Sequence, residues 1–350
     1  MPYGRPSPQP DAGRLALPVT RTDLDLASYA DRVGGWSTSL ANVAEVMIPC
    51  LDIAGARSVC EVGAYAGDLT RLLSDWAAKA GATVIAVDPS PKPALVELDE
   101  RRDELELVRQ TSIEALPHIE LPNAVIIDGD HNYWTVREEL RLIAERAVDG
   151  DMPLLMFHDI SWPHAYRDDY FAPELIPEDS RHPMAGPDES RGLYPGDPGL
   201  RPGGPPYPRS AATEGGARNG VRAAIEDFVA ENPGLRFTGV PAFFGFGVVW
   251  HEEAPWAEQL AEHLEPWDAN PVIARLEANR VRHLADMQVQ ANELWKARER
   301  LARQEAVLRR LLESSAFSVA ERMSRLRGRA GVGKGQAVIS KDEVRRALEG

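Results

Sequence analysis

The sequence has 350 residues, of which 43% are hydrophobic and 27% charged, and its formal net charge is −15 at pH 7. This composition is typical of a soluble globular protein that is long enough for one large domain with an appendage, or for two domains. The negative charge argues against a nucleic-acid-binding protein, because broad binding to phosphates needs a basic surface. With only two cysteines, the chain can form neither a disulfide framework nor a thiolate metal cluster.

The expected location is the cytoplasm. Cys50 and Cys60 both lie in apolar stretches, so we expect buried, unreactive thiols, which suits a reducing compartment. Residues 1–13 contain Pro and Gly but no apolar core, so they do not form a signal peptide. No apolar run reaches the ~18 residues that a membrane helix needs.

The N-terminal part precedes the regular pattern. Its prolines predict that residues 1–22 are disordered. Residues 23–52 predict two helices around Gly34 and Gly35. Two interpretations remain open for these helices: they cap a binding site, or they simply pack on a sheet.

From Arg57 onward, short apolar runs alternate with segments of helical periodicity. Strands are predicted at residues 58–62, 83–88, 105–109, 124–128 and 153–157, and helices at 68–80, after Pro93, from Thr111 and around 136–147. Continuous apolar strands joined by helices indicate a parallel sheet that is covered on both faces. The fold class is therefore α/β and doubly wound.

A glycine-rich turn follows the first strand. Gly63 and Gly67 enclose small and aromatic residues, and helical periodicity begins at Asp68. Glycine lets the backbone turn sharply and approach a ligand, and the helix N-terminus offers free N–H groups. The second strand ends in Asp88, where doubly wound folds place a carboxylate for ribose hydroxyls. A tight turn without a ligand remains the alternative.

Acids and histidines follow the fourth and fifth strands. Asp128, Asp130 and His131 come after one, and His158 and Asp159 after the other. Neighbouring parallel strands would bring these side chains to one rim, where the carboxylates repel one another. A divalent cation, Mg²⁺ or Mn²⁺, would neutralise an oxygen-rich site of this kind. The alternative is that Asp128 and Asp159 only cap helices or turns.

Regular periodicity stops after the fifth strand. Residues 161–218 are rich in Pro, Gly and charge, and because they leave the ligand-binding edge of the sheet we predict a substrate-side lid, with plain disorder as the alternative. A helix from Asn219 and two apolar runs, 235–240 and 243–250, predict an antiparallel hairpin at one edge of the sheet. The main domain is expected to span residues 23–255.

The C-terminal part has a different character. Residues 256–316 are expected to form a long helix or coiled coil, which could join two chains into a homo-oligomer. Arg298 and Glu305 interrupt the heptad at a positions, whereas the apolar residues on a and d positions are Leu284, Met287, Ala291, Leu294, Leu301, Leu308 and Leu312. A helix folded back on its own domain is the alternative. Residues 317–350 form a basic tail, either merely solvated or able to touch a membrane surface.

The glycine turn resembles the first motif of the class I S-adenosylmethionine-dependent methyltransferases, here Glu61-Val-Gly63-Ala-Tyr65-Ala-Gly67, and Asp88 matches their second motif. The resemblance implies a Rossmann-like seven-stranded sheet, mostly parallel with an antiparallel edge strand, here followed by the long C-terminal helix. It also implies that Gly63–Gly67 lines the methionine part of the cofactor, that Asp88 binds the ribose and that Glu61 lies near the amino group. The full set of expected cofactor-binding residues is Glu61, Gly63, Tyr65, Gly67, Asp88, Ser112 and Asp128.

The second constellation resembles a methyltransferase family that includes macrolide-sugar and aminocoumarin-sugar O-methyltransferases and cephalosporin-cluster enzymes. More distantly, it is similar to the cation-dependent catechol and caffeoyl-CoA O-methyltransferases. The resemblance implies a metal site made by Asp128, His158 and Asp159, although the relatives usually have an acid in place of His158. The catechol-type enzymes have a catalytic Lys three residues after the strand-four Asp. In this chain His131 occupies that position and is expected to be the base.

The expected function is therefore that of an S-adenosylmethionine-dependent O-methyltransferase acting on a hydroxyl of a sugar, a glycosylated small molecule or a glycan, with metal assistance. The alternatives are a metal-independent methyltransferase that uses His131 as base, and a non-catalytic scaffold that retains the cofactor fold. A nicotinamide oxidoreductase is disfavoured, because the glycine spacing differs from G-x-G-x-x-G.

Overall fold

The structure is a computed structural model of the whole chain, and it describes residues 23–30, 38–147, 151–188, 190–329 and 339–349. Two compact units are present, residues 1–285 and residues 286–350. The expectations for residues 1–22, Gly34, Gly35 and the turn at 148–150 lie outside the described residues.

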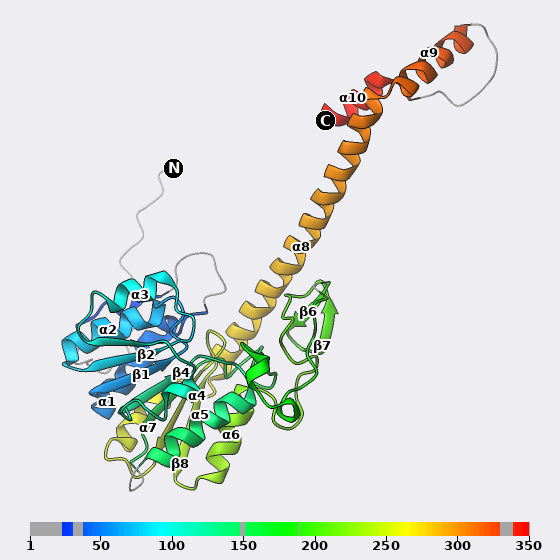
Figure 1. Cartoon of the computed structure of the whole chain (residues 1–350). Helices are drawn as coiled ribbons and strands as arrows, with labels where there is room; N and C mark the ends of the chain where they lie inside the picture. The colour runs from blue at the N-terminus through cyan, green and yellow to red at the C-terminus, as the bar shows by residue number, and fades with distance from the viewer. Residues whose placement is uncertain (1–22, 31–37, 148–150, 189, 330–338, 350) are drawn as a thin grey trace, which may run out of the picture. The chain divides into compact units, whose positions relative to one another are not determined.

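The first unit is built on a seven-stranded sheet in the order β3-β2-β1-β4-β5-β9-β8 (Figure 1). The strands are β1 (Ser58–Val62), β2 (Thr83–Val87), β3 (Leu105–Val108), β4 (Ala124–Ile127), β5 (Leu154–Phe157), β8 (Leu235–Val240) and β9 (Phe246–His251). The first five are parallel neighbours, whereas β9 runs antiparallel to both β5 and β8. The predicted Rossmann-like fold and the predicted hairpin at one edge are confirmed.

Helices cover both faces of the sheet. One face carries α1 (Ala44–Ala54), α2 (Asp68–Ala80), α3 (Pro93–Asp99) and α7 (Ala257–Leu264), and the other carries α4 (Ser112–Ala115), α5 (Tyr133–Arg146) and α6 (Val221–Glu231). The first expected helix is only a single 3₁₀ turn, Leu26–Ser28, among the described residues, and a second 3₁₀ turn, Leu40–Val43, leads into α1.

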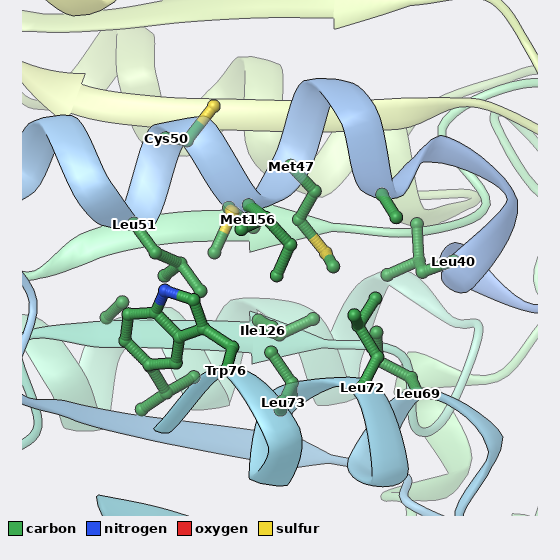
Figure 2. Packing of buried hydrophobic residues seen from close by; sticks show 14 of the residues in the cluster. Leu40, Met47, Cys50, Leu51, Leu69, Leu72, Leu73, Trp76, Ile126 and Met156 are labelled. Atoms are coloured by element: carbon green, nitrogen blue, oxygen red, sulfur yellow. The ribbon is translucent and has the colours of Figure 1, made fainter. Parts of the chain in front are cut away.

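Two hydrophobic cores lie against the two faces of the sheet. Figure 2 shows the larger one, in which Trp76 of α2 lies beside Leu51 of α1, with Ile126 and Met156 contributed by the sheet. The Trp76 indole N–H donates a hydrogen bond of 3.0 Å to the buried Asp52 carboxylate, so its polar atom is satisfied inside the core.

Both cysteines are free and buried, as predicted. Cys50 lies on α1 and Cys60 on β1. Burial raises the pKa of both thiols, which suppresses the reactive thiolate form.

Residues 161–218 form an insertion, and its described part is folded. Its elements are short and irregular, so the sequence shows no helical or strand periodicity there. It contains two 3₁₀ turns, Pro173–Leu175 and Glu178–Ser180, and a separate hairpin of β6 (Arg191–Tyr194) and β7 (Asp197–Pro202). Arg167 and Asp168 are fully buried at its centre. Arg167 donates to the carbonyls of Ala211 (2.6 Å) and Pro198 (2.8 Å).

Asp168 joins this insertion to the sheet domain. Its Oδ1 accepts hydrogen bonds from the backbone N–H groups of Tyr133 (2.8 Å) and Gly220 (2.7 Å), and its Oδ2 accepts one from the Tyr170 hydroxyl (2.8 Å). One carboxylate therefore anchors the insertion to the starts of α5 and α6.

The second unit contains the end of α8 (Pro271–Glu313) together with α9 (Ser315–Arg329) and α10 (Lys341–Glu349). The predicted long helix is confirmed as α8, which matches the helical pattern over 271–313. The expected element began at residue 256, but residues 257–264 form the separate helix α7. No helix in the described part of the chain combines the length and the apolar character needed to cross a membrane.

The turn after β1 is pressed against the chain that follows β4. The Gly63 N–H donates to the Val87 carbonyl (2.9 Å), and the Asp128 N–H donates to the Val62 carbonyl (2.9 Å). Gly63 has φ +89°, and a Cβ on it would lie 2.2 Å from the Asp128 carbonyl oxygen. Only glycine fits this position.

We predict that Gly63→Ala lowers the free energy of unfolding by roughly 3 kcal/mol or more, because backbone atoms must move apart. Gly55→Ala is the matched control. It shares the positive φ of +66°, but its Cβ would have no atom within 4 Å, so the expected loss is about 1–2 kcal/mol. Urea denaturation measures both values, and equal losses in the two variants would contradict the close-approach argument.

Candidate active site

A cavity of about 690 Å³ opens at the carboxyl ends of β1, β2, β4 and β5. In doubly wound sheets this is where ligands bind, at the point where the strand order reverses between β1 and β4. Among its lining residues are all but one of the sequence-predicted site residues: Glu61, Gly63, Tyr65, Asp88, Ser112, Asp128, His131, His158 and Asp159. The exception is Gly67, which does not line the cavity. Gly67 is the N-cap of α2 and adopts φ +85°.

Asp88 organises the glycine turn. Its Oδ2 accepts a hydrogen bond from the Tyr65 N–H and its Oδ1 accepts one from the Ser90 N–H, both at 2.7 Å. The carboxylate is buried yet borders the cavity. Because a carboxylate has about four lone-pair sites, capacity for two ribose hydroxyls remains.

Glu61 is fully enclosed beneath the same turn. It accepts a hydrogen bond of 2.6 Å from the Thr70 hydroxyl. Burial, with added repulsion from Asp128 and Asp88, raises the pKa of Glu61 to about 8. A bound ligand with an ammonium group would stabilise the ionised form and so gain a charged partner here.

Four of the five residues expected to meet at the ends of β4 and β5 come together. The fifth, Asp130, instead accepts hydrogen bonds from the Phe171 N–H (2.9 Å) and the Thr135 hydroxyl (3.1 Å). Nδ1 of His158 lies 3.0 Å from Asp128 Oδ1 and 3.3 Å from Asp159 Oδ2. Nε2 of His131 lies 3.0 Å from Asp159 Oδ2 and 3.7 Å from Asp128 Oδ1. Two carboxylates therefore face two imidazole rings.

These neighbours set the protonation states of the cluster. Burial alone would lower the pKa of His131, but Asp159, Asp128 and Asp169 outweigh it and raise that pKa to about 9. The same balance holds the pKa of His158 well above its ordinary range. Burial of Asp159 is likewise outweighed by His158 and His131, which lower the pKa of this carboxyl. The cluster is thus two carboxylates balanced by imidazolium charge.

The residues at the ends of β4 and β5 also fit a divalent cation. One donor atom from each of Asp128, His158 and Asp159 lies within 4.8 Å of the others. Nε2 of His158 lies 2.8 Å from the Phe243 carbonyl oxygen, which can only accept, so Nε2 carries a proton and Nδ1 faces the acids. Metal-binding histidines are oriented by a second hydrogen bond of this kind. Two carboxylates and one imidazole suit Mg²⁺ or Mn²⁺.

Backbone strain is concentrated around the cavity. Tyr65 (φ 43°), Asp159 (φ 57°), Phe243 (φ 50°) and Phe244 (φ 67°) all have positive φ without being glycine. Such conformations cost about 1–3 kcal/mol each and persist where surrounding contacts enforce them. Phe244 is held by Glu277 of α8, whose carboxylate accepts a hydrogen bond of 2.8 Å from the Phe244 N–H.

Several lining residues were not singled out by the sequence reasoning. His164, Asp169, Phe171, Leu175 and Tyr207 all come from the insertion. His131 and His164 are stacked, with ring centroids 4.9 Å apart. Burial lowers the pKa of His164 to about 4. His164 and Asp169 can be read in the sequence, but the segment that contains them has no periodicity. Their position beside the cavity therefore could not be predicted.

Residues 60–160 match a protein family whose description is "Methyltransferase domain". The match covers the segment from within β1 to just past β5, and the prediction of a methyltransferase is confirmed. A comparison with curated protein sequences finds no match.

Solved structures of methyltransferases are among those that resemble this chain. One is an SAH-bound methyltransferase from Podospora anserina, with 15% identity and a TM-score of 0.39, covering 67% of this chain and 85% of its own. Another is an O-methyltransferase from Bacillus cereus in complex with SAH, with 15% identity and a TM-score of 0.36, covering 64% and 84%. A putative caffeoyl-CoA O-methyltransferase from Staphylococcus aureus has 6% identity and a TM-score of 0.35, covering 64% and 87%. Likeness at this level identifies neither substrate nor mechanism.

We predict that Glu61→Gln stabilises the ligand-free protein at pH 8 but not at pH 4. The unfolded chain ionises Glu61 near pH 4.5, whereas the folded protein keeps it protonated up to about pH 8, so the free energy of unfolding falls as pH rises between these values. Glutamine does not ionise, so the variant avoids this fall in the free energy of unfolding. At pH 8 we expect Glu61→Gln to exceed the wild type by on the order of 3 kcal/mol.

Urea denaturation across this pH range measures the gain. Glu258→Gln, which changes an exposed carboxylate on α7, is the control. A constant difference between Glu61→Gln and wild type from pH 4 to pH 8 would show that Glu61 is not buried in its neutral form.

Proposed function

We propose that this methyltransferase transfers the methyl group of S-adenosylmethionine to a hydroxyl of a sugar, a glycosylated small molecule or a glycan, with the assistance of a divalent cation. The observation that carries the proposal is the placement of the two constellations. The turn of Gly63 and Asp88 and the cluster of Asp128, His131 and Asp159 border one cavity. A methyl donor held by the first would present its sulfonium toward the second.

The glycine turn and its neighbours are the proposed donor site. Asp88 would accept hydrogen bonds from the ribose hydroxyls, and Glu61 would pair with the ammonium group of the methionine part. Both carboxylates already border the cavity, in a frame fixed by Thr70 and by the Tyr65 N–H. Fixing the donor in one orientation supplies most of the catalysis that methyl transfer needs, because the sulfonium is already activated.

His131 is the proposed proton acceptor. As the acceptor oxygen bonds to the methyl carbon and the carbon–sulfur bond breaks, the hydroxyl proton passes to the imidazole and S-adenosylhomocysteine is left. In the cation-free protein Asp159 and Asp128 keep this ring protonated. A cation held by Asp128, His158 and Asp159 would balance those carboxylates and lower the pKa of a hydroxyl beside it.

The insertion provides the proposed acceptor side. Phe171, Leu175 and Ile176 place apolar surface on the cavity that also contains the charged cluster. The hydroxyls of a glycosylated acceptor would contact the acidic cluster. Its apolar aglycone would pack against these apolar residues. This arrangement favours a glycosylated small molecule among the candidate acceptors.

A metal-independent enzyme is the second candidate, and the geometry of His158 favours it. This ring is proton-bearing at Nε2 and lies between two carboxylates at Nδ1, so it can supply positive charge without a metal. Methyl transfer that is unchanged after EDTA treatment would select this candidate over the first.

We also propose that α8 joins two chains. Its apolar residues Met287, Leu294 and Leu301 fall on the a and d positions, and each is more than half exposed. Sedimentation of the full-length chain distinguishes a dimer from a monomer, and a monomer at all concentrations would contradict the pairing.

We predict that Asp128→Asn weakens Mn²⁺ binding at least tenfold, because the amide keeps the shape of the side chain but removes one anionic ligand. Electron paramagnetic resonance of free Mn²⁺ measures the affinity, and methyl transfer to a panel of glycosylated acceptors should fall about 100-fold or more in Mg²⁺. Asp227→Asn on α6 is the control, since Asp227 bonds the Tyr133 hydroxyl away from the cluster. Full activity of Asp128→Asn would refute the metal role.

We predict that Asp88→Asn lowers the affinity for S-adenosylhomocysteine about 10- to 100-fold. It weakens charge-assisted bonds to the ribose and loosens the turn at Tyr65. Calorimetric titration measures the affinity, and a melting curve confirms that the variant is folded. An unchanged affinity in a folded variant would move the donor site away from this turn.

A further inference from the structure

The cavity contains a second cluster that the proposed methyl transfer does not use in full. One donor atom each from His131, His164 and Asp169 lies within 4.8 Å of the others. His131 follows β4, whereas the other two belong to the insertion. The cluster is distinct from that of Asp128, His158 and Asp159, although Asp159 lies 3.0 Å from His131.

His164 is the feature that points to a ligand. Its side chain is 5% exposed and lines the cavity, and its Nδ1 atom is buried with no hydrogen-bond partner among the residues that the structure describes. Leaving such an atom unpaired costs about 1–3 kcal/mol. A group that binds at Nδ1 would recover this cost.

The other two residues are held in place by bonds that leave donor atoms available. The Ser210 hydroxyl donates to Asp169 Oδ1 at 2.7 Å, which orients the carboxylate and leaves Oδ2. The backbone N–H of Asp169 donates to the His131 carbonyl at 2.9 Å, so the two residues are fixed to each other. Tyr207 packs its edge against His164, with ring centroids 5.7 Å apart. Metal ligands are commonly braced by outer contacts of this kind.

We propose that His131, His164 and Asp169 form a second divalent-cation site, selective for cations that prefer imidazole ligands, such as Zn²⁺ or Co²⁺. Two imidazoles and one carboxylate are a donor set for these ions, whereas the oxygen-rich first cluster suits Mg²⁺ or Mn²⁺. Bonds of about 2.0–2.2 Å require the donor atoms to lie roughly 3–4 Å from one another, and they already lie within 4.8 Å.

Occupation of the second site has a consequence that, unlike the site itself, rests on the proposed function. A nitrogen lone pair of His131 cannot both bind a cation and accept a proton from the acceptor. A cation in the second site therefore withdraws the base, and the site is inhibitory. Zn²⁺ is expected to inhibit methyl transfer by the wild type more strongly, relative to its uninhibited rate, than by His164→Gln.

The test is the number of Co²⁺ ions that the full-length chain binds, measured by equilibrium dialysis and by the visible absorption of bound Co²⁺. The wild type should bind two ions. Asp128→Asn, which disables the first cluster, should bind one. His164→Gln and Asp169→Asn should each bind one, and Asp128→Asn combined with His164→Gln should bind none. His118→Gln, which removes an exposed histidine, should still bind two.

Melting curves show whether each variant is folded, and Asp169→Asn keeps the shape of the side chain if His164→Gln fails to fold. A wild type that binds one ion, lost in Asp128→Asn and His164→Gln alike, would mean a single shared centre and would overturn the second site. Two ions retained in folded His164→Gln and Asp169→Asn would overturn it as well. The readout needs neither methyl donor nor acceptor, so failure of methyl transfer would leave this result standing.

Discussion

The balance of charge at the ends of β4 and β5 governs the rest of the site. Asp128 and Asp159 follow the ends of two adjacent strands and both contact the His158 ring, so their repulsion must be offset by protonated imidazole or by a cation. In a buried site unbalanced charge costs several kcal/mol, which is far more than surface pairs contribute. The elements around the cluster hold these carboxylates and imidazole rings in place.

The supports come from distant parts of the chain. The Phe243 carbonyl fixes the His158 ring, and the strained turn that presents it is held by Glu277 of α8, which is itself paired with Arg280. In the insertion, the backbone N–H of Asp169 donates a hydrogen bond to the His131 carbonyl. The N-terminal part of α8 and the insertion therefore position the site residues, as the sheet does.

Much of the sheet domain could be predicted because its signals are local. Apolar runs bounded by glycine and acids gave β1, β2 and β8 almost to the residue, and parallel pairing then required Asp128 and Asp159 to meet at one rim. The helical period likewise predicted α2 and α8.

The remaining parts depend on contacts between residues far apart in the chain. The insertion is ordered by the buried Arg167 and Asp168, which bond backbone groups more than 30 residues away and leave no periodic trace. His164 and Asp169 reach the cavity only through that arrangement. Phe243 and Phe244 appeared to continue a strand, but tertiary contacts hold them in a left-handed turn, so β9 begins at Phe246.

The most direct test of this account is a crystal structure of the full-length protein with S-adenosylhomocysteine and Mn²⁺, in which anomalous scattering locates the metal. The account predicts S-adenosylhomocysteine with its ribose on Asp88, and an anomalous peak within bonding distance of Asp128 and Asp159 on the side of the cavity that faces the sulfur. S-adenosylhomocysteine bound at Asp88 with no peak near these two carboxylates would contradict the metal-assisted mechanism, and its absence from the glycine turn would contradict the proposed donor site.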